Sequence, residues 1–151
     1  MGMIKWNVTF PFPPVQTPRP KYTFRGKGKV HTYYGEKYDN YLIKMHDYLE
    51  ENNLYNETFF KVAHAKYGVM ADINFYVQTP KSQKKINYLM KTTAPDIDNL
   101  LKATLDGIFN KKYIKERDSR IVGVKTLKFN EMDNPRTEVT LYGLEDMVDG
   151  K

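Results

Sequence analysis

Apolar and polar side chains alternate along several stretches of this chain, which is the pattern of a β-strand with one face in the core. The first alternation covers 4–10, where apolar residues such as Trp6 are separated by polar ones. Similar alternation covers 69–77 and 137–142, and 121–129 is rich in β-branched residues. The turn sequence Asp133-Asn134-Pro135 separates the last two of these stretches. The pattern therefore predicts four strands.

A different spacing, with apolar residues three and four positions apart, predicts two amphipathic helices. The first covers 38–49 and ends near Asn53, and the second starts at Ile97. Pro95 disfavours helix for the residue before it and Asp96 is a good N-cap, so the chain enters the second helix from an extended segment. The apolar residues of this helix are Ile97, Leu100, Leu101, Leu105 and Ile108. We expect all of them except Leu100 to pack on the sheet.

Between the first strand and the first helix, proline and glycine dominate the pattern. The stretch 11–21 is rich in proline and is neither a helix nor a central strand. It is either an extended surface loop or an arm that contacts DNA. The stretch 22–34 predicts a hairpin whose tip, 25–29, is glycine-rich and basic.

Together these elements predict an α+β fold in which two main helices pack on a mixed β-sheet. The stretch 59–67 is ambiguous between helix and strand. We expect a single compact domain over 1–151, with a loose tail from about 146 to the end.

The chain is basic, with 24 Lys and Arg against 18 Asp and Glu, a net charge of +6. This excess favours a polyanionic partner, with nucleic acid first and an anionic membrane surface second. No apolar run reaches the length of a membrane span, and the start of the chain lacks a signal-peptide pattern. The absence of cysteine excludes disulfides, thiolate zinc sites and cysteine nucleophiles. We therefore expect a cytoplasmic protein without a membrane partner.

Basic residues gather in the proline-rich stretch, the hairpin tip and the connector 81–93, where aromatic residues lie between several of them. Cations beside aromatic rings suit phosphates and unstacked bases, although charge runs in loops often only solubilise a protein. The predicted DNA-binding residues are Arg19, Lys21, Arg25, Lys27, Lys29, Lys81, Lys84, Lys85 and Lys91.

Two carboxylates and one ammonium meet where the second helix begins. Asp98 and Lys102 are four residues apart and therefore neighbours on the helix, and Asp96 lies just before it. Acids at this place often only cap a helix and offset its dipole, which remains the alternative interpretation. Asp118 precedes the next strand, and we expect it to return to the helix start because that strand can run back beside the helix.

Three carboxylates without a histidine partner suit a hard cation such as Mg²⁺, with Mn²⁺ as the alternative ion. The three histidines, His31, His46 and His64, share no ligand or triad spacing. A bound metal would polarise a phosphoryl oxygen and supply a hydroxide nucleophile, while Lys102 would neutralise charge on the phosphate or orient the attacking water. The pattern predicts a phosphodiesterase that acts on nucleic acid rather than on a small molecule.

The run 95–106 resembles the central motif of the RusA family of Holliday junction resolvases, endodeoxyribonucleases of bacteria and their prophages. The family pattern is Asp-x-Asp-Asn, then Lys, then Asp, then an Asp just before a strand. The segments 10–14 and 18–21 and the start of the first helix, 33–38, resemble family segments in the same order. The resemblance therefore covers most of the chain.

The resemblance implies roles for four residues of this chain. Asp96, Asp98 and Asp118 match the metal-binding and catalytic aspartates of the family, and Lys102 matches its essential lysine. Relatives often carry two adjacent Asp at the third site, where this chain has Arg117-Asp118. Glu116 is therefore an alternative to Asp118, which we favour. The family also implies a homodimer, dependence on Mg²⁺ and paired nicks in four-way junctions.

The sequence is compatible with three candidate functions. The first is a Mg²⁺-dependent, structure-selective endodeoxyribonuclease that resolves Holliday junctions in DNA recombination and repair. The second is a non-catalytic basic DNA-binding module whose acids only cap a helix. The third is a general nuclease for flaps and other branched DNA. We favour the first because the acids and the lysine of the family motif are all present.

Overall fold

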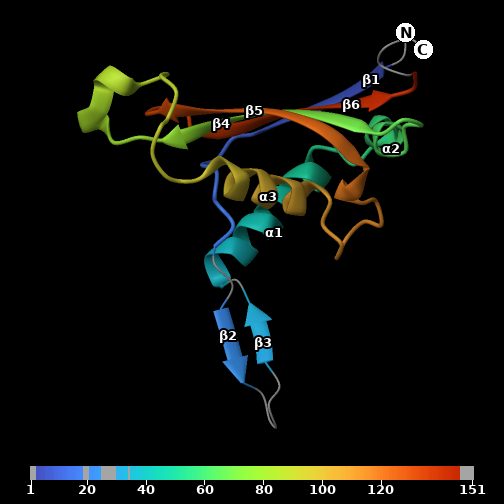
Figure 1. Ribbon diagram of the computed structural model, residues 1–151, viewed down its shortest axis with the longest axis horizontal. Coiled ribbons are helices and arrows are strands. Elements are labelled where there is room, and N and C mark those ends of the chain that lie inside the picture. Colours follow the sequence, from blue (N-terminus) through green and yellow to red (C-terminus); the bar gives the residue numbers. More distant parts are fainter. Residues whose placement is uncertain (1–2, 19–20, 25–29, 34, 147–151) are drawn as a thin grey trace.

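The computed structural model describes residues 3–18, 21–24, 30–33 and 35–146, with only the backbone given for 21–24 and 30–33. A four-stranded sheet forms one layer, and the helices lie against one of its faces (Figure 1). The helical layer contains α1 (Glu36–Glu51), α2 (Glu57–Ala63) and α3 (Ile97–Ile108). The predicted α+β class is therefore confirmed, as is the single compact domain.

The sheet contains β1 (Met3–Phe10), β4 (Val69–Gln78), β5 (Ile121–Glu131) and β6 (Arg136–Leu144), in the order β1-β6-β4-β5. β6 pairs antiparallel with β1 and with β4, whereas β4 and β5 are parallel. The predicted mixed sheet is confirmed. The parallel pair requires a long crossover, and the chain between β4 and β5 supplies it with α3. The crossover is therefore the segment that carries the acidic motif.

A second, two-stranded ribbon consists of β2 (Lys21–Phe24) and β3 (Val30–Tyr33), which pair antiparallel. It extends from the start of α1 away from the sheet (Figure 1). This confirms the predicted hairpin, while its basic tip, 25–29, lies outside the described residues.

The ambiguous stretch resolves into a short helix followed by a turn. α2 ends at Ala63, and the Asn56 side chain caps it by accepting a hydrogen bond from the N–H of Phe59 at 3.0 Å. The rings of Phe59 and Trp6 meet edge to face with centroids 5.0 Å apart. This N-cap stabilises the start of a helix rather than a strand, and the aromatic contact packs the helix onto β1.

The core lies between the sheet and the helices. The inward-facing residues of β4 are all buried, and they meet buried residues of α1 such as Met45 and Leu49. The indole N–H of Trp6 donates to the carbonyl of Leu54 at 2.8 Å, so the one polar atom of this core side chain is satisfied.

The expected packing face of α3 was partly wrong. Ile97 is 36% exposed, and Leu101 and Leu105 are only partly buried, whereas Ile108 is buried as expected. The buried residues of α3 are Leu100, Ala103, Thr104, Gly107 and Ile108. A Cβ at Gly107 would collide with Met45 of α1, so small residues allow α1 and α3 to approach closely. The buried face is therefore centred on small side chains that a count of large apolar residues overlooks.

No helix among the described residues is both long and apolar enough to cross a membrane.

Candidate active site

The start of α3 presents two carboxylates to solvent. Asp96 occupies the N-cap position with an extended backbone, and its carbonyl accepts the N–H of Leu100 at 3.2 Å. Its carboxylate, however, makes no capping hydrogen bond. Asp98 lies in the first turn, where its Oδ1 accepts the N–H of Asn99 at 3.0 Å. Capping therefore explains neither the exposure nor the direction of the Asp96 carboxylate.

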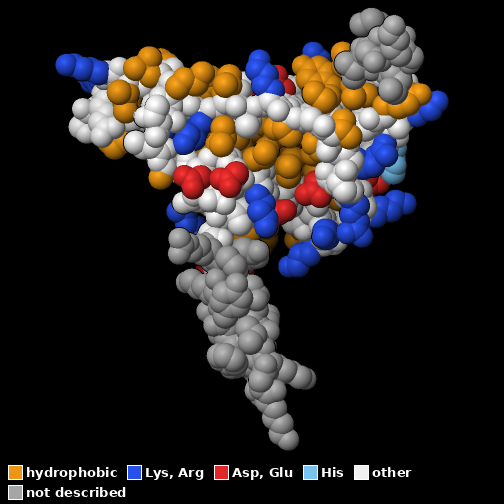
Figure 2. All heavy atoms as spheres, viewed as in Figure 1, with side chains coloured by type: hydrophobic (Ala, Val, Ile, Leu, Met, Phe, Trp, Pro, Cys, Tyr) orange, Lys and Arg blue, Asp and Glu red, His pale blue; other side chains and the backbone are white. Residues whose placement is uncertain are grey.

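These carboxylates border an open pocket of about 500 Å³ between α3 and the edge strand β5. Two lysines, Lys91 and Lys128, border the same pocket. Its lining residues are Met90, Lys91, Asp96, Ile97, Asp98, Thr126, Leu127 and Lys128. Figure 2 shows acidic side chains over the start of α3, with basic side chains nearby and apolar surface between them and the sheet. The pocket thus combines negative groups that suit a cation with positive groups that suit a phosphate.

Lys102 lies one turn after Asp98 on α3, and its side chain is exposed. The helix geometry therefore keeps it on the same side of α3 as Asp98, as the four-residue spacing predicted.

Asp118 does not return to the start of α3, contrary to expectation. It begins the 3₁₀ turn η2 (Asp118–Arg120), just before β5. There it borders a different pocket of about 300 Å³, together with Asp106 in the last turns of α3 and Asn110 just after that helix. Asp98 and Asp106, the nearest α3 residues that border the two pockets, are eight positions apart, which is about 12 Å along the helix axis. Among the described residues, no three Asp, Glu, His or Cys side chains form a group able to hold a metal.

The position of β5 explains why Asp118 lies away from the start of α3. This strand does run back beside α3, as expected, but Thr126–Lys128 in its middle are the residues that reach the helix start. Asp118 lies before the first residue of the strand and is therefore left at the opposite end. The direction of β5 could be predicted from the sequence. The position of Asp118 depends also on the register, that is, on which residues of β5 lie beside the start of α3.

Glu116, the alternative third acid, is buried. Its Oε2 lies 2.9 Å from Nε2 of the exposed His64, and only 6% of its side chain is exposed. A buried carboxylate with a protein partner is poorly placed to hold a solvated cation, whereas Asp118 is exposed. The structure therefore favours Asp118 over Glu116 as the available acid.

The proline-rich stretch runs beside α3. The N–H of Thr17 donates to the carbonyl of Asn99 at 3.0 Å, and Thr17 Oγ1 donates to the Tyr38 hydroxyl at 3.4 Å. That hydroxyl donates to Oδ2 of Asp106 at 2.9 Å, so Asp106 ties α3 to α1. The described part of this stretch, up to Pro18, is thus packed on the helix that carries the acids.

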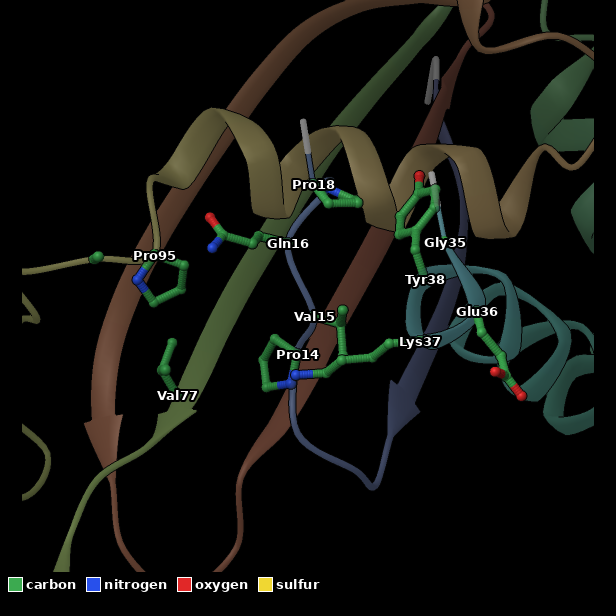
Figure 3. Close-up of a pocket in the computed structure, with 11 residues that line it drawn as sticks. Pro14, Val15, Gln16, Pro18, Gly35, Glu36, Lys37, Tyr38, Val77 and Pro95 are labelled. Carbon is green, nitrogen blue, oxygen red and sulfur yellow. The ribbon is translucent and has the colours of Figure 1, made fainter. Parts of the chain in front are cut away.

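A larger pocket of about 670 Å³ lies under this stretch (Figure 3). Pro95 and Gln16 lie at one end of it and Tyr38 and Glu36 at the other. Its walls are mostly apolar, and Pro95 is the residue directly before Asp96.

The predicted DNA-binding residues lie in different parts of the chain. Lys91 lies at the acidic pocket, while Lys81, Lys84 and Lys85 are exposed on the 3₁₀ turn η1 (Lys81–Ile86), beyond the end of β4. Lys21 lies in β2, and its side chain is not described. The other four, Arg19, Arg25, Lys27 and Lys29, lie outside the described residues. Sequence reasoning overlooked Lys128, although a lysine on the same face of the strand as Val122, Val124 and Thr126 was a usable signal.

Comparison with family models matches residues 11–142 to the family described as endodeoxyribonuclease RusA. The chain belongs to the RusA endodeoxyribonuclease family. A search of curated protein sequences returned no match to the chain. The RusA match includes the Asp96 pocket, the hairpin and Asp118, so the family resemblance inferred from the motif is confirmed over most of the chain.

Membership of the RusA family makes this chain a nuclease that acts on DNA, and the family acts on branched junctions. Nucleases of this kind use a divalent metal, and the residues at the start of α3 fit one. Mg²⁺ is commonly held by one or two carboxylates together with waters and substrate phosphates. Asp96 and Asp98 supply two exposed carboxylates at an open pocket, and the set contains only hard oxygen donors.

Proposed function

We propose that this protein is a divalent-metal-dependent endodeoxyribonuclease that resolves Holliday junctions by paired hydrolysis of phosphodiester bonds. The observation that carries the proposal is the pair Asp96 and Asp98 at an open pocket that also contains Lys91 and Lys128. The Asp96 carboxylate takes no part in capping, so the interpretation of both acids as mere helix caps lacks support. Membership of the RusA family adds the substrate class.

Each side chain has a role that follows from its position. Asp96 and Asp98 would hold the metal, with Mg²⁺ the expected ion and Mn²⁺ the alternative. When bound, such a cation acts as a Lewis acid toward a phosphoryl oxygen and lowers the pKa of a bound water. Lys91 would bind the backbone phosphate at the same pocket, and Lys102 would stabilise charge that develops on it. Without the metal, the two carboxylates would repel the phosphate.

We further propose a homodimer that shares its active sites. A four-way junction is nearly two-fold symmetric, and two matched cuts need two sites. Within one chain Asp118 lies at the opposite end of α3 from Asp96 and Asp98. A second copy related by a two-fold axis would bring its Asp118 to the first chain's pocket, and the reverse. In this arrangement Asp96, Asp98 and Asp118 would serve the same active site while η2 keeps its structure.

The test is cleavage of synthetic DNA by the purified full chain. A four-way junction, a flap and a linear duplex of the same sequences are incubated with Mg²⁺, with Mn²⁺ and with a chelator. We expect symmetric nicks in the junction only when metal is present, with slower cutting of the flap and none of the duplex.

The alternatives predict other results in the same assay. Equal cutting of flap and junction would favour a general nuclease for branched DNA. Junction binding without cutting under every metal condition would favour the non-catalytic binding module and remove the proposed function. Metal-dependent cutting of the junction in clear preference to the flap would separate the proposal from both.

A further inference from the structure

The segment that leads into α3 is attached to the end of β5 through its backbone, but only as far as Lys91. The N–H of Tyr88 donates to the carbonyl of Asn130 at 2.8 Å, and the N–H of Asn130 donates to the carbonyl of Leu89 at 2.9 Å. The N–H of Lys91 donates to the carbonyl of Lys128 at 2.8 Å. Among the described residues, no backbone hydrogen bond joins β5 to the chain between Lys91 and Asp96.

Beyond Lys91, hydrogen bonds from a side chain of β5 take the place of backbone hydrogen bonds. The Nζ of Lys128 donates to the carbonyl of Thr93 at 2.7 Å and to the carbonyl of Pro95 at 2.6 Å. Hydrogen bonds from an ammonium are stronger than those between neutral groups. Lys128 is also half-buried between α3 and the strand, which limits competition from water. Its ammonium therefore fixes the peptide group directly before Asp96.

This attachment matters because nothing else in the described residues orients the Asp96 carboxylate. It makes no capping hydrogen bond, so its direction follows from its backbone. The backbone on its C-terminal side is fixed by the helix. The backbone on its N-terminal side is fixed by the two carbonyls that Lys128 binds.

We propose that Lys128 is a positioning residue, which sets the direction of the Asp96 carboxylate toward a divalent cation by holding the carbonyls of Thr93 and Pro95. The inference rests on the proposed function, because it gives Asp96 the role of metal ligand. Groups that orient metal ligands commonly change metal affinity by about 10- to 100-fold when they are removed.

The test compares four variants of the full chain. Lys128→Met keeps the length of the stem and removes both hydrogen bonds, while Lys128→Gln keeps one donor in case the first variant does not fold. Lys128→Arg keeps the charge and several donors. Lys125→Met is the matched control, because Lys125 lies on the same strand but at an exposed position in register with Asp72 of β4.

Two measurements do not depend on catalysis. In hydrogen exchange, we expect the hydrogen-bonded amides on either side of the attachment, those of Lys91 and Leu100, to exchange about tenfold faster in Lys128→Met, with the β4–β6 ladder unchanged. In a Mn²⁺ titration followed by electron paramagnetic resonance, we expect affinity to fall by about tenfold or more. Lys128→Arg should recover part of both, and Lys125→Met should match the wild type. Unchanged exchange and unchanged Mn²⁺ affinity in Lys128→Met would overturn the inference.

A third measurement separates positioning from DNA contact. Junction cleavage by Lys128→Met should fall by about tenfold or more at low Mg²⁺ and recover partly when Mg²⁺ is raised. Weaker junction binding with normal exchange and normal Mn²⁺ affinity would make Lys128 a phosphate contact only and would also overturn the inference. If the wild type cuts no DNA, the proposed function fails, while exchange and Mn²⁺ affinity still decide whether Lys128 positions Asp96.

Discussion

At the scale of single residues, Asp98 offers the sharpest test of the site. We expect Asp98→Asn to stay folded, because an amide keeps the shape and can still accept from the N–H of Asn99. The change removes one negative charge from a site that would hold its metal largely through charge. Junction cleavage should therefore fall by about 100-fold or more, because the metal is needed to activate water.

Junction binding by Asp98→Asn should be unchanged or tighter, because an acid beside a phosphate only repels it. Cleavage and a gel-shift assay without metal, performed on the same preparation, measure both effects. A folded variant that cuts junctions at nearly the wild-type rate would remove Asp98 from the active site. Thr92→Ala, an exposed substitution a few residues earlier, is a suitable control.

We expect substitution of Asp118 to affect DNA cleavage and substitution of Glu116 to affect stability. Asp118→Asn changes an exposed side chain, so the fold should be unaffected and cleavage should be lost. Glu116→Gln changes a buried group that contacts His64, so the free energy of unfolding should fall by about 1 kcal/mol while cleavage persists. Thermal unfolding and junction cleavage of both variants measure the difference, and loss of cleavage in stable Glu116→Gln would reverse the two assignments.

At the scale of elements, the turn between β5 and β6 is organised by one buried carboxylate. Glu131 is 2% exposed, and its Oε2 accepts the N–H of Asp133 at 3.0 Å and that of Asn134 at 3.3 Å. Its Oε1 accepts from Nη1 of Arg136 at 3.1 Å, and the Arg136 guanidinium lies 3.7 Å from the ring centroid of Tyr76. Burial alone would raise the pKa of Glu131, but these donors outweigh it and lower the pKa below 4.5.

This turn should make stability dependent on pH. Because the folded-state pKa of Glu131 is lowered, its contribution is complete above the unfolded-state pKa of 4.5 and is lost as pH falls through the folded value. At pH 7 we expect Glu131→Gln to lower the free energy of unfolding by about 2 kcal/mol, since hydrogen bonds to a charged group are lost. Urea titrations at pH 7 and at pH 3 should show the gap between variant and wild type closing at low pH, and an equal gap at both would refute this.

The sequence predicted most elements because their signals are local. Alternation located β1, β4 and β6, β-branched residues located β5, and spacing located α1 and the start of α3 at Ile97. The face of α3 could not be read in the same way, because Gly107 is buried by the approach of α1, a tertiary contact. Asp118 was misplaced for a related reason, since the register of β5 against α3 leaves no mark in the spacing of its residues.

At the scale of the whole molecule, the positive charge should control binding. A chain with a net charge of +6 that binds phosphates through lysines and arginines releases counterions from DNA. We expect junction affinity to fall by about 100-fold or more between 50 and 200 mM salt, measured by fluorescence anisotropy without metal. An affinity independent of salt would contradict a phosphate-based interface.

Shared active sites can be tested by mixing two defects. In a dimer of one Asp98→Asn chain and one Asp118→Asn chain, one shared site carries both changes and the other carries none. We expect this heterodimer, isolated through two different tags after co-expression, to nick one strand of a junction, whereas either variant alone cuts neither. If each chain instead supplied its own complete site, the heterodimer would be inactive, and a monomer in light scattering would defeat the dimer itself.

The pairing of the first strand with the last has a consequence for synthesis on the ribosome. Within the part of the chain that the structure describes, β1 pairs with β6 alone, from Met3 opposite Leu144 to Phe10 opposite Thr137. The residues of β1 therefore leave the ribosome before β6 is made, and all the other described elements are synthesised between the two strands. During that interval the apolar face of β1 has no strand beside it, and such segments are prone to association with other chains. A nascent chain that stops before β6 would thus lack the strand that joins β1 to β4, and this sheet is expected to assemble only after β6 has left the ribosome.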